Sequence, residues 1–495
     1  MAYLRQKLAD WAPAVAAALL LLAWEQRRGI GAGEAAWIHE GACRELAAGT
    51  TEGRQALVGS VWFAPLAVLA GAPAAYLVPA GREPWAAAAA SAAGVACALY
   101  AFRRLARRCL PAAAALPVWA AFAVMCRPMC RDPFLAVGVA AALAAAIKAV
   151  DWLASRRLAD LVKFGFALAA LALAGFPLAG FGLGLLLLLP VGPWLHAELR
   201  GRRPAVCILG GLPAVYAGCV WALMSWLILG DGLYPLRGLA ANLRWSGAGL
   251  ADVLPCLPAG LAILLVVAGG VWRRSLRAAA AGGLGLCLLA WTWLLQRMGL
   301  DWALGAAVAL LPLLAMVALL HLAASISGGA GPSGQPRPIG AALAVVLALG
   351  LCAGQAAVER RTTVRAGSGA SGQSDVLVRV ASDVRERTPY GRIFVCGYPG
   401  LALLRGERPE PFVPCLDLHI GLLRRDYARQ DLFLMIPVPT GAAASESLYW
   451  RYPDVYRRGT QSALFAGQYG AWRLFEIVAA PTEEMLKEWR KARGP

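Results

Sequence analysis

Charged residues are scarce in this chain, with only 15% Asp, Glu, Lys and Arg against 59% hydrophobic residues over 495 positions. Soluble globular domains carry about 25% charged residues, so this composition excludes an ordinary soluble protein. Apolar stretches of about 20 residues, long enough to cross a hydrocarbon core of about 30 Å as a helix, recur through the first 357 residues. Inside a bilayer the backbone must bond to itself. The sequence therefore predicts an all-α polytopic membrane domain over residues 1–357.

Histidine is rarer still, with four in the chain, and the 12 cysteines are scattered, mostly within apolar runs. Most of these cysteines are predicted to be small buried hydrophobic residues. Cys126 and Cys130 stand four apart, but no second Cys/His pair accompanies them, so no zinc site is predicted. Cys396 and Cys415, in the polar C-terminal part, are able to form a disulfide if that part is exported. No cofactor is predicted, and the question of a divalent metal ion stays open.

Acidic residues are also few, which leaves a formal net charge of +18. Much of the basic excess lies in short segments between apolar runs, where the positive-inside rule places it in a membrane protein. Nucleic-acid binding is therefore not predicted, and membrane lipids are the expected surroundings. The abundance of Ala and the preference for Arg over Lys suggest a GC-rich bacterial genome.

The basic clusters also predict the topology. They occur at 103–108, 156–163, 200–203 and 273–277, after a basic N-terminus. If all face the cytoplasm, an even number of crossings separates each from the next. The expected crossings are 11–24, 85–102, 109–127, 134–151, 164–176, 178–195, 205–229, 253–271, 278–296, 302–324 and 339–357.

One apolar stretch, 57–79, does not fit this parity. It contains Pro65 and Pro73, and the next stretch, 85–102, is free of proline. We therefore expect 57–79 to lie along or re-enter the outer surface. The first apolar run is interpreted as an uncleaved helix rather than a cleaved signal peptide. The result is about eleven transmembrane helices in a bacterial cytoplasmic membrane.

An odd number of crossings places the last part of the chain outside the cell. Residues 358–374 form a linker rich in Gly and Ser. Residues 375–495 are predicted to form a small extracytoplasmic α/β domain, with an amphipathic helix near 376–384 and strands in 392–398, 431–439 and 463–478. Its cluster of aromatic rings either stacks on sugars or packs the domain itself; the rings are Tyr449, Trp450, Tyr452 and Tyr456.

The predicted outer face carries acids and arginines from segments far apart in the chain. Glu40 lies on the first external loop, beside His39. Asp132 lies in the motif CRDPFL at the outward end of the third helix, flanked by Arg127 and Arg131. Two carboxylates and several guanidinium groups are therefore expected on one side of the membrane.

A further external segment, ILGDGLYPLRGLAANLRW, follows the seventh helix. It contributes Asp231, Arg237 and Arg244. Arg82 is a weaker external candidate. Arginine forks fit phosphate oxygens well, so these side chains are candidates for holding a phosphorylated substrate.

This pattern resembles the GT-C fold of glycosyltransferases that use polyprenyl-phosphate-linked sugars, the superfamily of protein O-mannosyltransferases and lipid A aminoarabinose transferases. Those enzymes carry an acid on the first external loop, surface helices after it, and a second acid, often in an Asp-Pro pair, after the third crossing. Glu40, the stretch 57–79 and Asp132-Pro133 fall at these places. The resemblance covers roughly residues 1–250. His-Glu stands where Asp or Asp-Glu is more usual, and 175–184 lacks the lysine of some relatives.

The resemblance implies an integral membrane glycosyltransferase that moves a hexosyl or pentosyl group from a polyprenyl-phosphate donor to a lipid, glycan or protein acceptor. Glu40 would be the base that accepts the acceptor's proton, and Asp132 would orient the acceptor. Cations would stabilise the leaving phosphate. The expected substrate-binding residues are His39, Arg82, Arg127, Arg131, Asp231, Arg237 and Arg244.

Three other classes of protein were weighed. A secondary transporter needs polar groups near the midplane, and the predicted spans hold almost none. A cell-envelope glycan polymerase or ligase shares the lipid-phosphate chemistry and stays open. So does a catalytically inactive GT-C-like scaffold that acts through its exported domain. The sequence does not specify the sugar, the acceptor or the oligomeric state.

Overall fold

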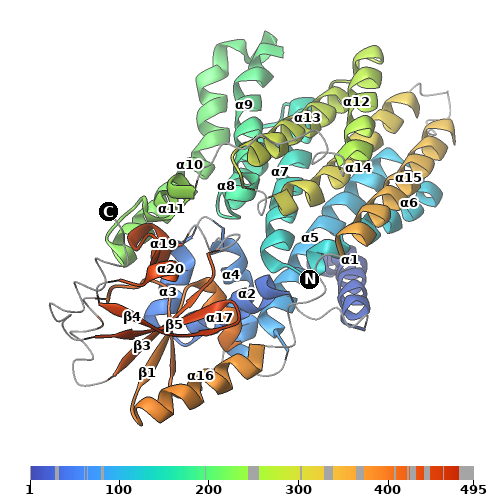
Figure 1. Cartoon of the computed structure of the whole chain (residues 1–495). Helices are drawn as coiled ribbons and strands as arrows, with labels where there is room; N and C mark the ends of the chain where they lie inside the picture. Colours follow the sequence, from blue (N-terminus) through green and yellow to red (C-terminus); the bar gives the residue numbers. More distant parts are fainter. Residues whose placement is uncertain are drawn as a thin grey trace.

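The computed structural model describes most of the chain, with gaps at several junctions. The described residues are 2–27, 33–60, 62–63, 65–79, 83–195, 197–242, 256–300, 304–327, 338–363, 373–405, 409–420, 423, 431–439, 446–460 and 462–478. Within these ranges a large helical bundle precedes a small domain built on one β-sheet (Figure 1). The mostly helical part and the small C-terminal sheet expected from the sequence are therefore both present.

Among the described residues, six helices are long and apolar enough to cross a membrane. They are α1 (Ala2–Arg27), α5 (Trp85–Cys109), α7 (Pro133–Ser155), α10 (Arg203–Leu229), α13 (Leu276–Arg297) and α14 (Leu304–Ser327). The most apolar segment of the six lies in α14 and is 89% buried, whereas the apolar segments of α1 and α10 are only 17% buried. In a soluble protein the exposed apolar faces of α1 and α10 would contact water, so their exposure favours a lipid environment.

Further apolar helices are shorter within the described residues. They are α4 (Pro65–Leu77), α6 (Ala112–Met125), α8 (Leu158–Ala172), α9 (Ala179–Leu195) and α12 (Leu257–Trp272). Helix α15 (Pro338–Thr363) has 26 residues, but its apolar part is the shorter segment Gly340–Cys352. Every predicted crossing coincides with a helix. Because only six helices in the described ranges meet the length and composition expected of a span, the count of about eleven stays a prediction.

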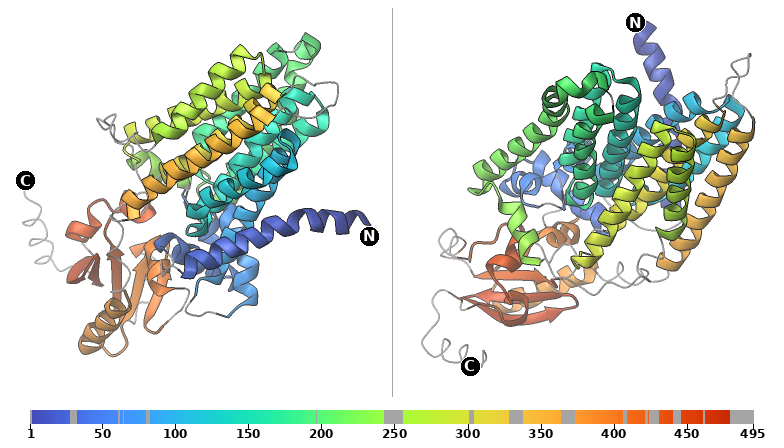
Figure 2. Two further views of the ribbon diagram at one scale, coloured as in Figure 1. Left: turned by 90° about the vertical axis from the view of Figure 1, so that its right-hand side faces the viewer. Right: turned by 90° about the horizontal axis from the view of Figure 1, so that it is seen from above.

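The apolar stretch 57–79 does not form one long helix. The chain instead folds into α2 (Glu34–Ala47), α3 (Thr51–Val58) and the 13-residue α4. Thr50 caps α3 by accepting a hydrogen bond from the Gly53 amide, and Gly49 turns the chain with φ of +70°. These three helices lie together at one end of the bundle, beside the start of α5 (Figures 1 and 2).

The C-terminal domain has a five-stranded mixed sheet in the order β2-β1-β3-β5-β4. Its strands are β1 (Arg392–Cys396), β2 (Phe412–Cys415), β3 (Leu432–Pro437), β4 (Ala463–Tyr469) and β5 (Trp472–Ile477). Strands β2, β1 and β3 are parallel, and β5 and β4 continue the sheet antiparallel. The predicted strands are confirmed, with 463–478 resolved into a hairpin; β2 was not predicted.

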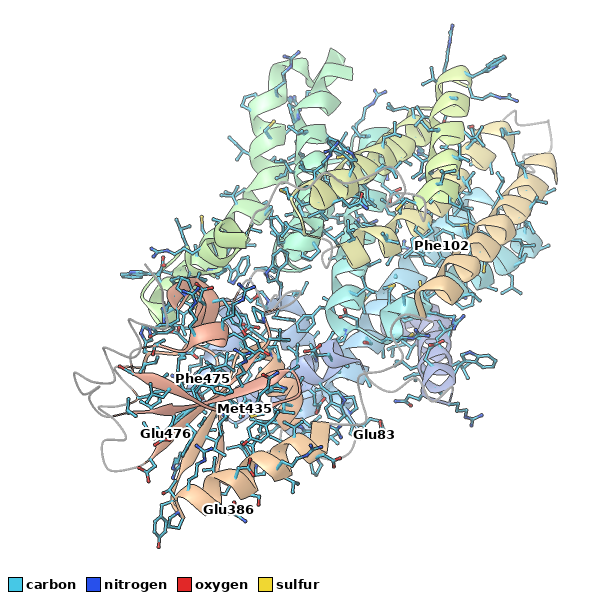
Figure 3. All side chains as sticks on the ribbon, in the orientation of Figure 1. Glu83, Phe102, Glu386, Met435, Phe475 and Glu476 are labelled. Carbon is cyan, nitrogen blue, oxygen red and sulfur yellow. The ribbon has the colours of Figure 1, made fainter. Side chains whose placement is uncertain are left out.

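Short helices complete this domain. They are α16 (Gln373–Arg387), α17 (Tyr398–Leu404), α19 (Ser447–Arg451) and α20 (Val455–Arg458). Buried valines of α16, Val380 and Val384, pack on β-sheet residues such as Met435, as their spacing predicts. Figure 3 shows Met435 and Phe475 within the sheet and Phe102 inside the helical bundle.

The two cysteines considered for a disulfide lie opposite each other. Cys396 and Cys415 are paired in register across β1 and β2. Both thiols are free in the structure. The conditional prediction of a disulfide between them stays a prediction.

The sheet domain packs against the end of the bundle that carries α2. Helix α17 lies directly on α2, where Gly41 allows the approach: a Cβ atom at Gly41 would stand 2.8 Å from the Cβ of Leu401. Tyr398 at the start of α17 stacks on Phe63, with ring centroids 4.4 Å apart. The carboxyl ends of β1 and β2 therefore meet the helices rather than solvent.

Candidate functional site

The junction between α2, the start of α7 and the C-terminal domain brings together residues from distant parts of the chain. His39 on α2 contacts Phe134 on α7 edge to face, with centroids 5.2 Å apart. Tyr234, at the start of α11 (Tyr234–Asn242), donates a 2.6 Å hydrogen bond to Asp417 of the C-terminal domain. Glu40 and Asp132 are close in sequence to His39 and Phe134, so they lie at the same end of the bundle.

Glu40 is buried at this junction, and both of its oxygens are engaged. Oε2 accepts hydrogen bonds from the amides of Ala86 and Ala87, at 2.7 and 3.2 Å, in the first turn of α5. Oε1 forms a 2.8 Å ion pair with Arg44, and the Glu40 side chain is only 1% exposed. The carboxylate thus satisfies unpaired amides at a helix N-terminus. Because the Glu40 side chain is buried and ion-paired, its surroundings do not support the predicted role as the base, which stays a prediction.

Arg44 extends the same connection to a third helix. Its guanidinium donates to the carbonyls of Val78 and Pro79, at 2.9 and 3.0 Å, where α4 ends. Glu40 and Arg44 therefore tie α2 to the N-terminus of α5 and to the C-terminus of α4. Both contacts match the polarity of the helix ends, with an acid at the amides and a base at the carbonyls.

His39 is also internal rather than exposed to a substrate. Its ring is fully buried, and Nε2 lies 2.7 Å from the Ala67 carbonyl on α4. Burial lowers the pKa of His39 to about 4, so the ring is neutral near pH 7 and donates to that carbonyl. The prediction that His39 contacts substrate is corrected: it packs α2 on α4, where Gly71 leaves room for the ring.

Asp132 occupies the N-cap of α7. Its Oδ1 accepts from the amides of Phe134 and Leu135, at 2.9 and 3.1 Å, and Pro133 fills the first helical position. Burial raises the pKa of Asp132 above its ordinary value, although these two bonds oppose the shift. Because the observed cap uses one oxygen, the position stays compatible with the predicted orienting role.

Arg127 and Arg131 are committed to an acid that the sequence analysis passed over. The Glu25 carboxylate, near the end of α1, accepts hydrogen bonds from Nε of Arg127 at 2.8 Å and from Nε of Arg131 at 2.9 Å. The Glu25 side chain is 5% exposed. Two guanidiniums on one buried carboxylate anchor α1 to the α6–α7 junction. The two arginines therefore form an interhelical ion pair, and their contact with a phosphate stays a prediction.

Asp231 and Arg237 pair with each other at the end of α10, with Nε 2.9 Å from Oδ2. Asp231 also accepts from the Leu233 amide, so it shapes the turn into α11. The Arg237 side chain is 61% exposed and is therefore free to meet a ligand. Arg82 and Arg244, the other predicted phosphate contacts, lie outside the described residues.

Glu34, a second acid of α2, has the properties that Glu40 lacks. It is the first residue of the helix, it is exposed, and the N-cap Gly33 supplies no side-chain cap. Surrounding protein nevertheless desolvates its carboxyl group and raises its pKa above the ordinary value. A carboxylate that reaches solvent and has a raised pKa is suited to accept a proton. The sequence signal was the acid at the helix start, six residues before Glu40.

Glu446 lies close enough to Glu34 to feel its charge. Both carboxylate oxygens of Glu446 accept from the Tyr398 amide, at 3.1 Å each, at the N-terminus of α17. Burial, with the negative charge of Glu34 added, raises the pKa of Glu446 well above its ordinary value. An acid of the C-terminal domain therefore faces the start of α2.

A second polar cluster joins α11 to the C-terminal domain. Asp417, after β2, accepts from Tyr234 and pairs with Arg451 at 2.5 Å. Arg451 also contacts Nε2 of His419 at 2.5 Å and lies over the rings of Tyr234 and Trp450. None of the three polar residues of the sheet domain was predicted, because only the fold brings the end of β2 to α19.

The aromatic cluster of the C-terminal domain divides between two roles. Trp450 packs edge to face on Tyr234 at 5.4 Å, at the junction. Tyr449, Tyr452 and Tyr456 pack within the core of their own domain. The packing alternative therefore holds for these three rings, whereas Trp450 contacts Tyr234 of α11.

Metal binding finds no ready site in the described part of the chain: no group of three or more His, Cys, Asp or Glu side chains is placed to hold an ion there. Comparison with known proteins adds no assignment. No protein-family model matches the chain, and no curated protein matches it at a significant level. Function therefore has to be argued from the site alone.

Proposed function

We propose that the protein is an integral membrane glycosyltransferase that takes a sugar from a polyprenyl-phosphate donor at the extracytoplasmic face. One observation carries the proposal. A first long apolar helix is followed by three short helices with an accessible acid, and Asp132-Pro133 opens α7 at the same end of the bundle. This is the order of parts in the GT-C arrangement that the sequence resembles.

In this proposal Glu34 replaces Glu40 as the general base. The acceptor hydroxyl gives its proton to the Glu34 carboxylate while its oxygen attacks the anomeric carbon and the lipid phosphate departs with the bonding electrons. The raised pKa of Glu34 makes it a stronger base than an ordinary glutamate. Asp132 orients the acceptor, and Arg237, exposed on α11, meets the charge that grows on the phosphate.

The proposal includes the predicted topology, with about eleven helices in a bacterial cytoplasmic membrane and the C-terminal domain outside. Helix α5 gives the sharpest test, because one 25-residue helix joins the two sides. At 1.5 Å per residue it is about 37 Å long, enough to cross the hydrocarbon core. Glu83 precedes it at the domain end, where Figure 3 labels it, and Arg107 lies in its last turn.

We expect a membrane-impermeant thiol reagent to label Glu83→Cys in intact cells and Arg107→Cys only after permeabilisation. Both side chains are exposed, so accessibility depends on the side of the membrane. Mass analysis of the labelled peptides separates these sites from the native cysteines. Labelling of position 107 in intact cells would reverse the topology.

Turnover tests the function itself. Membranes that contain the protein are incubated with a panel of polyprenyl-phosphate-linked hexoses and pentoses, and release of polyprenyl phosphate is measured. The wild type should consume at least one donor, and Asp132→Asn should consume it at least tenfold more slowly. Glu83→Gln, which changes an exposed acid, is the control and should keep the wild-type rate. Consumption of no donor, or equal rates in Asp132→Asn, would contradict the proposal.

A scaffold without activity is the second candidate. The observation that favours it is that Glu40, Arg127 and Arg131, three of the predicted site residues, form ion pairs within the protein. Such a protein would act by binding through its C-terminal domain. The turnover measurement separates the two candidates.

A further inference from the structure

A pocket of about 630 Å³ lies at the other end of the bundle, away from the C-terminal domain. It is formed where α5 and α7 end and where α8 and α13 begin. Six cationic side chains from these four helices line it: Arg104, Arg108, Lys148, Arg157, Lys163 and Arg277. Neither the proposed transfer reaction nor the sequence analysis uses this pocket.

Two aspartates in the lining balance only part of this charge. Asp151 pairs with Lys148 at 3.3 Å and with Arg108 at 3.5 Å. Asp160 pairs with Lys163 at 3.8 Å and accepts a 2.6 Å hydrogen bond from the Ser155 hydroxyl. Six cations around two carboxylates leave an excess of four positive charges facing one cavity.

Three of the four lining arginines, counting Arg104 near the end of α5, have no acidic partner among the described residues. Arg157 and Arg277 form no ion pair within the described ranges of the chain. Both side chains are exposed, and each comes from the start of a different helix. Repulsion among these cations is relieved when an anion binds between them.

The positive-inside rule explains arginines in loops, but it does not explain how deep this pocket reaches. Lys148 stands seven residues before the end of α7, about 10 Å along the helix, yet lines the same cavity. His321 of α14 is 4% exposed, and its Nε2 has no hydrogen-bond partner in the described part of the chain. The charges of Arg277 and Asp151 act on this ring. Polar groups thus continue from the helix ends toward the hydrocarbon core.

We propose that this pocket binds a phosphate group, carried either by the headgroup of an anionic phospholipid or by a soluble phosphate compound. Guanidinium groups bind phosphate oxygens through paired hydrogen bonds, and basic pockets between transmembrane helices suit anionic headgroups. In the proposed topology this end faces the cytoplasm. The site does not depend on the transferase activity.

Native mass spectrometry of the purified full chain tests the proposal, with phosphatidylglycerol as the probe and phosphatidylcholine as the neutral comparison. The pocket variant is R157Q/R277Q. The control R273Q/R274Q removes two exposed arginines from the same α12–α13 junction that do not line the pocket. Thermal unfolding confirms that both variants fold.

We expect R157Q/R277Q to weaken phosphatidylglycerol binding by about fivefold per charge, about twenty-fivefold in all, and the control to bind as the wild type does. Inorganic phosphate identifies the source of the ligand. If inorganic phosphate raises the unfolding temperature of the wild type but not that of the pocket variant, the ligand is a soluble phosphate compound. If it changes neither unfolding temperature and R157Q/R277Q binds phosphatidylglycerol more weakly, the ligand is a lipid. Equal losses of phosphatidylglycerol binding in both variants would overturn the site. So would the absence of any loss in R157Q/R277Q together with no effect of inorganic phosphate on the thermal stability of the wild type.

Discussion

Glu34→Gln should reduce sugar transfer by about 10²–10⁴-fold while the protein folds as before. The substitution keeps the size and hydrogen-bonding capacity of the side chain but removes the group that accepts the proton. Glu34 is exposed at the start of α2 with no side-chain cap in its first turn, so the helix loses little. The measurement is the initial rate of donor consumption in membranes with matched amounts of protein.

The pH dependence adds a second readout. Burial raises the pKa of Glu34, and a base must be deprotonated to act. The rate should therefore fall as the pH is lowered through this raised pKa, above the ordinary range of glutamate near 4.5. The matched control, Glu83→Gln, should keep both the rate and the profile. A Glu34→Gln variant with more than about a tenth of the wild-type rate would exclude Glu34 as the base.

Glu40→Ala should instead act on folding, and cost about 3–5 kcal/mol of stability, the range for breaking one partner of a buried ion pair. It removes a carboxylate that holds two amides of α5 and leaves Arg44 without its anion. Loss of folded protein, measured by thermal unfolding in detergent, should account for any loss of activity.

A double variant distinguishes this structural role from catalysis. Glu40→Leu/Arg44→Met replaces both charges by apolar groups, which often restores much of the stability lost when one partner is removed. We expect it to unfold at a higher temperature than Glu40→Ala and to regain activity per folded molecule. If Glu40→Ala is as stable as the wild type yet inactive, the present assignment of Glu40 is wrong.

The elements of this fold were accessible from sequence because they follow from local patterns. Apolar length located the helices, and the four-residue spacing of Val376, Val380 and Val384 located α16. Strand β2 was missed because it has four residues and contains Pro414, which weakens any strand signal.

The chemistry of the junction was less accessible, because it depends on contacts over long separations. Glu40 reaches amides 46 and 47 residues away, and Glu25 meets arginines more than 100 residues away. Spacing alone offered one hint, since Arg44 stands four residues after Glu40 and such pairs attract on a helix. Beyond that spacing and the place of Glu34 at the helix start, no local pattern separates Glu40, which is buried, from Glu34, which reaches solvent.

The contact between Gly41 and Leu401 imposes a delay on the assembly of the protein. Helix α2 emerges early during synthesis, but the segment that covers its Gly41 face is made 360 residues later. At about 5–20 residues per second, this face waits about 20–70 s for α17. Over that interval a membrane insertase, a chaperone or another protein has access to it, so the order of synthesis gives such a factor a defined period in which to act on the nascent chain.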